Sequence, residues 1–175
     1  LLSSCGGNAI RTWDAASAEK REDGKSLLDR ARDNDIFVTV GLWLGHERHG
    51  FRYDDSSSII RQRNEVIESI KRLKDHPALL CWGLGNEMEG PEGKGDSTQV
   101  WKEVNILAGL IKKHDPHHPV MTVVANVNGA KLAAIKKHAP LIDILGVNVY
   151  SGAAGMDKTL RNLGWQKPYC VTEYG

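Results

Sequence analysis

The segment ALLCWGLGNE, residues 78–87, is an unbroken apolar run that ends abruptly in Gly85, Asn86 and Glu87. A run of this length without polar alternation is typical of a parallel β-strand that is buried on both faces. Gly85 permits the backbone to turn where the strand ends, so Asn86 and Glu87 are expected just beyond its carboxyl end. In barrels and open α/β sheets, active sites lie at this end of the strands. The alternative for Glu87 is a solvated acidic residue in a loop.

A second apolar segment, near the end of the chain, has the same form. Residues 168–175, PYCVTEYG, place Glu173 where a strand of this kind ends. Two parallel strands that each carry a carboxylate to the same rim bring the two carboxylates together. Such a pair provides the catalytic groups that hydrolyse a glycosidic bond. The pair favours a functional role for Glu87 over that of a solvated loop residue.

The rest of the chain alternates between predicted strands and predicted helices. The predicted strands cover residues 8–13, 36–44, 78–87, 120–124, 142–150 and 169–172. The predicted helices cover residues 25–34, 58–74, 129–138 and 156–163, with one more that is capped by Ser97 or Thr98 and ends near residue 114. Residues 1–4 read as the end of a helix, and residues 14–24 as a polar loop. Repeated strand-then-helix units imply right-handed crossovers and a parallel sheet.

Polar residues after the strands distinguish between two parallel folds. Six units are too few for a closed (β/α)8 barrel, and a doubly wound sheet would suit that number. A doubly wound sheet concentrates polar residues at one switch point, whereas a barrel gathers them from every strand into one pocket. Here they follow nearly every strand, as Arg11, His46, Asn86, Glu87, Asn126, Tyr150 and Glu173. We therefore predict an α/β fold of the (β/α)8 TIM-barrel type, with residues 1–175 forming a single partial catalytic barrel domain.

Composition and charge narrow the possible partners. The 175 residues are 41% hydrophobic and carry a formal net charge of +1, which gives no argument for a nucleic-acid or anionic-membrane partner. No apolar run approaches the roughly 20 residues of a membrane span. The three cysteines are odd in number and form no CxxC motif, so they are expected to be buried free thiols. The sequence does not determine the cellular compartment, although a periplasmic or extracellular location is slightly favoured. It does not determine the oligomeric state either.

Four short segments together resemble a known group of enzymes. WGLGNE at residues 82–87 and TEYG at residues 172–175 resemble the strand-4 and strand-7 signatures of the clan A retaining glycoside hydrolases. The TEYG ending looks closest to glycoside hydrolase family 2, the β-galactosidases, β-glucuronidases and β-mannosidases, and is also similar to fungal-type β-1,3-glucanosyltransferases. Residues 8–13 resemble strand 2 of the clan, and residues 146–150 resemble strand 6. The resemblance thus runs from barrel strand 2 to strand 7, and we expect a fragment without strands 1 and 8.

The resemblance implies roles for five residues. Glu87 would be the general acid/base and Glu173 the nucleophile of a retaining enzyme that cleaves β-glycosidic bonds through a glycosyl-enzyme intermediate. Asn86 would bind the 2-hydroxyl of the substrate, and Arg11 and Tyr150 would keep Glu173 charged and oriented. The chemistry asks for the same residue types, because a guanidinium and a phenol stabilise a charged nucleophile while the acid must hold its proton. A retaining mechanism requires carboxyl groups about 5–5.5 Å apart. We expect a glycoside, oligosaccharide or polysaccharide substrate, with no cofactor and no metal.

Other residues near the strand ends have two interpretations each. His46 is predicted to contact substrate, because it follows the third barrel strand. Trp43 is either a platform on which a sugar stacks or a core residue, and Asn126 is either a substrate contact or a simple turn residue. Trp82 is expected to pack in the core rather than to line the site. Glu89, two residues further into the loop, is the main rival for the acid.

Three other functions remain open. A transglycosylase would use the same two carboxylates with a second sugar as acceptor in place of water. A non-catalytic carbohydrate-binding relic is suggested by the absent strands. A metal-dependent barrel enzyme would use His46, His49 and Glu87, although two histidines three residues apart more often belong to a solvated loop.

Overall fold

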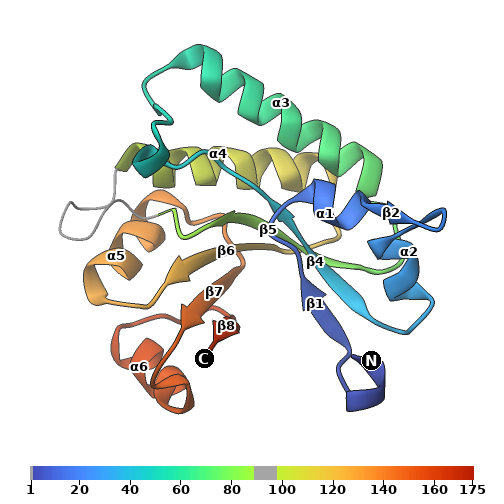
Figure 1. Ribbon diagram of the computed structural model, residues 1–175. Helices are drawn as coiled ribbons and strands as arrows, with labels where there is room; N and C mark the ends of the chain where they lie inside the picture. The colour runs from blue at the N-terminus through green and yellow to red at the C-terminus, as the bar shows by residue number, and fades with distance from the viewer. Residues whose placement is uncertain (1, 89–97) are drawn as a thin grey trace.

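A six-stranded parallel sheet organises the computed structural model, which describes residues 2–88 and 98–175 (Figure 1). Its strands are β1 (Ala9–Arg11), β4 (Phe37–Leu42), β5 (Leu79–Asn86), β6 (Val120–Ala125), β7 (Ile144–Val149) and β8 (Tyr169–Tyr174). Their order across the sheet is their order along the chain, and every neighbouring pair is parallel. An order without reversal has no switch point, so this sheet is part of a barrel rather than a doubly wound sheet.

Helices follow the strands and cover the outer face of the sheet (Figure 1). The helices are α1 (Ala15–Glu19), α2 (Leu27–Arg32), α3 (Ser56–Leu73), α4 (Thr98–His114), α5 (Gly129–His138) and α6 (Met156–Asn162), with short 3-10 turns η1 (Ser3–Cys5), η2 (Glu47–His49) and η3 (Ala153–Gly155). In the described part of the chain, no helix is both long and apolar enough to cross a membrane. The bounds of these elements confirm the six predicted strands and the predicted helices between them, with ends that differ by a few residues.

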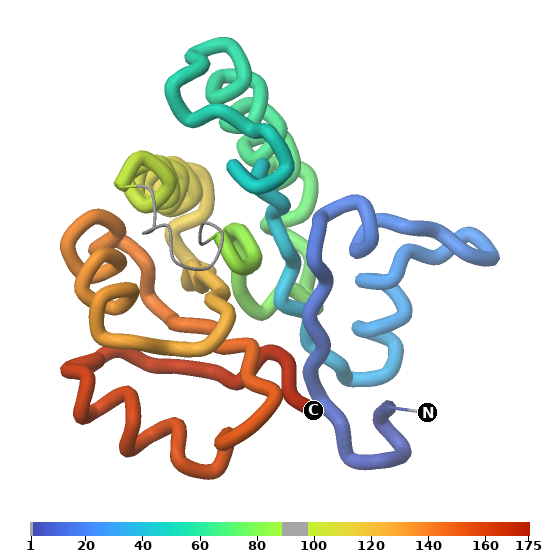
Figure 2. The backbone as a smooth tube through the Cα atoms, turned by 60° about the vertical axis from the view of Figure 1, so that its left-hand side comes forward, coloured from blue at the N-terminus to red at the C-terminus, as the bar shows by residue number. Residues whose placement is uncertain are grey.

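The sheet curls so far that its two outer strands approach each other. Figure 2 shows the end of the chain beside β1. The two strands are not paired in the sheet, yet Arg11 of β1 forms an ion pair with Glu173 of β8. The curvature brings the carboxyl ends of all six strands to one rim, as the predicted partial barrel requires.

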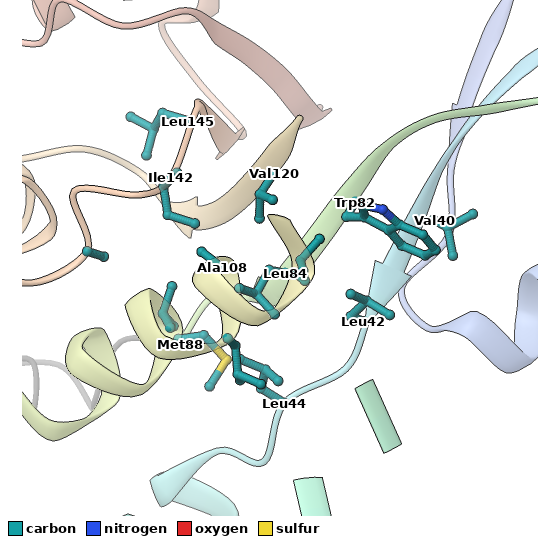
Figure 3. Close-up of a cluster of buried hydrophobic side chains, with 14 of the residues drawn as sticks. Val40, Leu42, Leu44, Trp82, Leu84, Met88, Ala108, Val120, Ile142 and Leu145 are labelled. Atoms are coloured by element: carbon teal, nitrogen blue, oxygen red, sulfur yellow. The ribbon is translucent and has the colours of Figure 1, made fainter. Parts of the chain in front are cut away.

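The hydrophobic core lies between the sheet and its helices, as Figure 3 shows for Val40, Leu84 and their neighbours. Trp82 is fully buried in this core, and its indole N–H donates a hydrogen bond of 2.8 Å to Oδ2 of Asp115. This hydrogen bond offsets the cost of burying the indole N–H, which is about 1–3 kcal/mol when the group is left unpaired. Trp82 is thus a core residue, as expected.

The structure differs from the prediction at residues 14–24. Instead of a polar loop, this segment contains α1 and the first strand of a small hairpin, β2 (Arg21–Glu22) with β3 (Lys25–Ser26). Asp14 caps α1 by accepting a hydrogen bond of 2.6 Å from the backbone N–H of Ser17. The helix has only five residues, so it is too short to show a helical period in the sequence.

The cysteines also depart from expectation. All three are free, but Cys81 alone is buried, whereas Cys5 and Cys170 are exposed. Cys170 is exposed because its strand, β8, is at the edge of the sheet and pairs with β7 alone among the described strands. Two other predicted features, the capping residue Ser97 and the rival acid Glu89, lie outside the described residues.

Candidate active site

The end of β5 holds Glu87 in an unusual backbone conformation. Gly85 has φ of +70° and Glu87 has φ of +50°, so the chain enters the left-handed region twice within three residues. A side chain in this region costs roughly 1–2 kcal/mol, which the surrounding contacts must offset. The backbone N–H of Glu87 donates a hydrogen bond of 2.8 Å to the carbonyl oxygen of Val123 in β6. This bond fixes Glu87 at the rim rather than in a free loop.

Glu173 is surrounded by three hydrogen-bond donors. Its Oε1 accepts hydrogen bonds from the guanidinium of Arg11 and from the indole N–H of Trp13, the latter at 3.2 Å. Its Oε2 accepts a hydrogen bond of 2.6 Å from the hydroxyl of Tyr150. This hydrogen bond raises the pKa of Tyr150 above 10, with burial and the charges of Glu173 and Glu87 adding to the effect. The Tyr150 hydroxyl therefore stays protonated near neutral pH and remains a donor to the carboxylate.

Two amide side chains connect the surroundings of the two carboxylates. Oδ1 of Asn86 accepts hydrogen bonds from Arg11 at 3.1 Å and from Nδ2 of Asn148 at 3.3 Å. Nδ2 of Asn148 also donates a hydrogen bond of 2.8 Å to Oε1 of Glu87. A continuous path of polar contacts therefore runs from Glu173 through Arg11, Asn86 and Asn148 to Glu87. We call these five residues the carboxylate network.

Sequence reasoning missed Asn148 and Trp13. Asn148 is a polar residue within the apolar strand β7, and it is buried. It precedes Tyr150 by two residues, as Arg11 precedes Trp13, and side chains two apart along a strand point to the same face. A search for polar residues at this spacing from the predicted site residues would have found both.

The loop after β4 supports the backbone of Asn86 and Glu87. His46 is buried, and its Nε2 lies 2.7 Å from the carbonyl oxygen of Asn86. Because a carbonyl can only accept, Nε2 carries the proton and donates. Arg48 donates a hydrogen bond of 3.1 Å from Nη1 to the carbonyl oxygen of Glu87. His46 thus supports the backbone of Asn86, and it also lines the same hollow as Trp43. Its contact with substrate stays a prediction.

Trp43 and Asn126 lie on the exposed rim. Trp43 is 45% exposed, so it is not a core residue, and its ring centre is 4.8 Å from that of His46. With His49 and Phe51 it lines an open hollow of about 720 Å³. Asn126 is exposed at the end of β6 with φ of +53°. Its backbone N–H donates a hydrogen bond of 3.0 Å to the backbone carbonyl oxygen of Asn148.

The histidines of the same loop lie near each other. The rings of His46 and His49 have centres 5.3 Å apart. Within residues 2–88 and 98–175, no three or more His, Cys, Asp or Glu side chains are grouped closely enough to hold a metal ion. The metal-dependent alternative therefore finds no ligand set among the described residues.

Comparisons with known proteins identify the family of this chain. Residues 33–175 match the family described as glycosyl hydrolases family 2, TIM barrel domain. Human β-glucuronidase is 28% identical over 150 residues, which cover 86% of this chain and 20% of that protein. Mannan endo-1,4-β-mannosidase F of Aspergillus clavatus is 27% identical over 123 residues, 67% of this chain and 27% of that protein.

The solved structure of Bifidobacterium dentium β-glucuronidase complexed with coumarin-3-O-glucuronide has the same fold. It superposes with a TM-score of 0.72 at 22% identity, over 99% of this chain and 28% of that one. The chain therefore spans about a fifth to a quarter of the length of the two curated relatives. Since the family match covers most of its residues, this chain belongs to the glycosyl hydrolase family 2 TIM-barrel domain family.

Proposed function

We propose that this barrel carries the catalytic centre of a retaining β-glycosidase. The observation that carries the proposal is the unequal surroundings of the two carboxylates. Among the described residues, Glu173 accepts hydrogen bonds from a guanidinium, an indole and a phenol, whereas the Glu87 carboxyl accepts one from the neutral amide of Asn148. Donors and a cation favour a charged carboxylate, which a nucleophile must be. No cationic side chain of residues 2–88 or 98–175 forms an ion pair with the Glu87 carboxyl, so this group is the better proton holder of the two.

In the first step, Glu173 attacks the anomeric carbon of the sugar while Glu87 protonates the glycosidic oxygen. The bond from the anomeric carbon to that oxygen breaks, the alcohol leaves, and a glycosyl ester forms on Glu173. In the second step, the Glu87 carboxylate takes a proton from water as the water oxygen bonds to the anomeric carbon. The bond from the anomeric carbon to Glu173 breaks as the new bond forms, and Glu173 returns as a carboxylate. Two inversions restore the original β configuration.

The other site residues bind and orient. Asn86 has its amide oxygen occupied by Arg11 and Asn148, so its Nδ2 is the group that can donate to a sugar hydroxyl. Trp43 offers an exposed aromatic face on which a sugar ring can stack. His46 contributes indirectly, by holding the backbone of Asn86. A glycoside or a saccharide chain is the proposed substrate class.

Substitutions of the two carboxylates provide the test. The substrates are 4-nitrophenyl β-glycosides of glucuronic acid, mannose, galactose and glucose, and the readouts are nitrophenol release and the configuration of the first product by proton NMR. Glu173→Gln is expected to abolish turnover with the fold intact, and residual activity above about a hundredth would refute the assignment, since nucleophile removal costs far more. Glu47→Gln is the control, because Glu47 is an exposed carboxylate outside the carboxylate network.

Small anions separate the roles of the two residues. With azide present, Glu87→Ala should form the β-glycosyl azide, because azide replaces water in the second step. Glu173→Ala should form the α-glycosyl azide, because azide replaces the nucleophile itself. The reverse pattern would exchange the assignments. Sugar binding without hydrolysis of any glycoside would instead identify a carbohydrate-binding protein, and net transfer to an added sugar would identify a transglycosylase.

A further inference from the structure

The end of β1 follows a path that fixes the position of Trp13. The backbone N–H of Thr12 donates a hydrogen bond of 3.0 Å to the carbonyl oxygen of Thr39 in β4, and the N–H of Gly41 donates one of 3.1 Å to Oγ1 of Thr12. The backbone of Trp13 lies directly on Gly41, where a Cβ atom would stand only 2.3 Å from the carbonyl carbon of Trp13. A residue without a side chain is therefore needed at Gly41 for Trp13 to reach its place.

The side chain of Trp13 is both exposed and precisely directed. The residue is 58% exposed, yet its indole N–H points to Oε1 of Glu173 at 3.2 Å. An indole N–H is only a donor, so it favours the charged form of the carboxylate. A tryptophan this exposed gains little from burial, which leaves the contact with Glu173 as the main consequence of its placement.

We propose that Trp13 is a positioning residue for the nucleophile Glu173. Trp13 and Arg11 together occupy Oε1, while in the described part of the chain Oε2 accepts one hydrogen bond, from Tyr150. Oε2 therefore has the more available lone pairs and is the oxygen that attacks the anomeric carbon. The proposal rests on the function proposed above, because it assigns a role within that reaction.

The two steps of the reaction use this arrangement differently. When Oε2 bonds to the anomeric carbon, Oε1 becomes the carbonyl oxygen of the ester and still accepts the indole N–H. When water bonds to the anomeric carbon and gives its proton to Glu87, the bond between that carbon and Oε2 breaks, and its electron pair returns to the carboxylate of Glu173. Donors on Oε1 stabilise that returning charge, so Trp13 is expected to accelerate the second step more than the first.

Trp13→Phe tests the kinetic role, because phenylalanine keeps an aromatic ring and removes the N–H. On a nitrophenyl glycoside for which the second step limits turnover, kcat should fall about tenfold to hundredfold, the loss expected for a hydrogen bond to a charged group. KM should fall or stay constant, because the ester accumulates. A rise in KM with kcat unchanged would overturn the proposal. Trp165→Phe is the matched control, since its indole N–H faces the carbonyl oxygen of Pro168 instead.

Indole NMR tests the contact without requiring turnover. The chain has five tryptophans, so ¹H–¹⁵N spectra should contain five indole signals, and Trp13→Phe identifies one of them by its disappearance. Glu173→Gln is expected to move this signal to higher field, because a neutral amide is a weaker acceptor than a carboxylate, while the other four keep their positions. An unchanged Trp13 signal would overturn the proposal. This result stands even if no glycosidase activity is found, so the two proposals fail separately.

Discussion

The amide group of Asn148 donates a hydrogen bond of 2.8 Å to the carboxyl group of Glu87, although the two residues are 61 positions apart in the sequence. Asn148 is itself oriented by Thr172, whose hydroxyl donates a hydrogen bond of 2.7 Å to its Oδ1. Because the guanidinium of Arg11 can only donate, the Asn86 atom that faces it is Oδ1, and the Asn148 atom that donates to this oxygen is Nδ2. The same Nδ2 therefore faces Glu87. The position of the proposed acid thus depends on a side chain from another strand. Substitutions of Asn148 and Thr172 can test this dependence.

Asn148→Ala should impair catalysis more than folding. We expect kcat to fall about tenfold to hundredfold, because a proton donor that moves by an ångström loses much of its advantage. Product configuration should not change, since Glu173 keeps its three donors. Thr172→Val, which removes only the orienting hydroxyl, should have a smaller effect in the same direction. A larger loss for Thr172→Val than for Asn148→Ala would contradict the proposal that Thr172 acts on Glu87 through Asn148.

Lysine should not be able to replace Arg11 in catalysis, although it carries the same charge. The guanidinium of Arg11 contacts Glu173 and Asn86 with two different nitrogens, and a lysine has a single nitrogen to offer. We expect kcat/KM to fall at least about a hundredfold in Arg11→Lys, by the loss of one charge-assisted contact and the misplacement of the other. Arg48→Lys is the comparison, because Arg48 makes a single contact with a backbone carbonyl and lysine can donate to it. Equal losses in the two variants would argue against a role for Arg11 in connecting Glu173 to Asn86.

Gly41→Ala should destabilise the fold where Gly83→Ala does not. A Cβ at Gly41 would meet backbone atoms of Thr12 and Trp13 at 2.3–2.4 Å, which the chain relieves only by moving β1. A Cβ at Gly83 would have its nearest contact at 3.4 Å, with a methyl group of Thr39. Urea unfolding should show a loss of about 1–3 kcal/mol for Gly41→Ala and under 1 kcal/mol for Gly83→Ala, as overpacking predicts. Similar midpoints would show that β1 adjusts freely.

The stability of the protein should depend on pH through His46. Burial lowers the pKa of His46 below 6.5, assisted by the charges of Arg48 and His49 and opposed by the hydrogen bond to Asn86 and the charge of Glu87. Between the lowered pKa and 6.5, the unfolded chain binds more protons at this site than the folded one. The contribution of neutral His46 is therefore fully present above about pH 6.5 and is lost as the pH falls toward the lowered pKa.

His46→Gln should flatten this dependence, because glutamine can donate to the carbonyl oxygen of Asn86 without titrating. Urea midpoints measured from pH 7.5 to pH 5 provide the comparison. His49→Gln, at an exposed neighbouring position, should retain the steeper slope of the unmodified protein. Parallel curves for the unmodified protein and His46→Gln would show that the acid-sensitive group lies elsewhere.

The fold was largely predictable because its signals are local. The apolar run at residues 78–87 and its polar ending are visible in the chain itself, and so are the helical spacing of α3 and the strand-then-helix order. Residues 14–24 were the exception, because a five-residue helix and a two-residue strand contain too few positions to display a period.

The sequence by itself determined the strands, their order and the two glutamates, one just after β5 and one near the end of β8, since each depends on residues that are neighbours in the chain. The tertiary structure alone decided which side chains meet: Arg11 and Glu173 are 162 residues apart, and Trp13 reaches the same carboxylate. It also buried His46 and placed its Nε2 against the carbonyl oxygen of Asn86. These contacts depend on the curvature of the sheet and the register between strands, which arise from the packing of the whole barrel and not from any one segment.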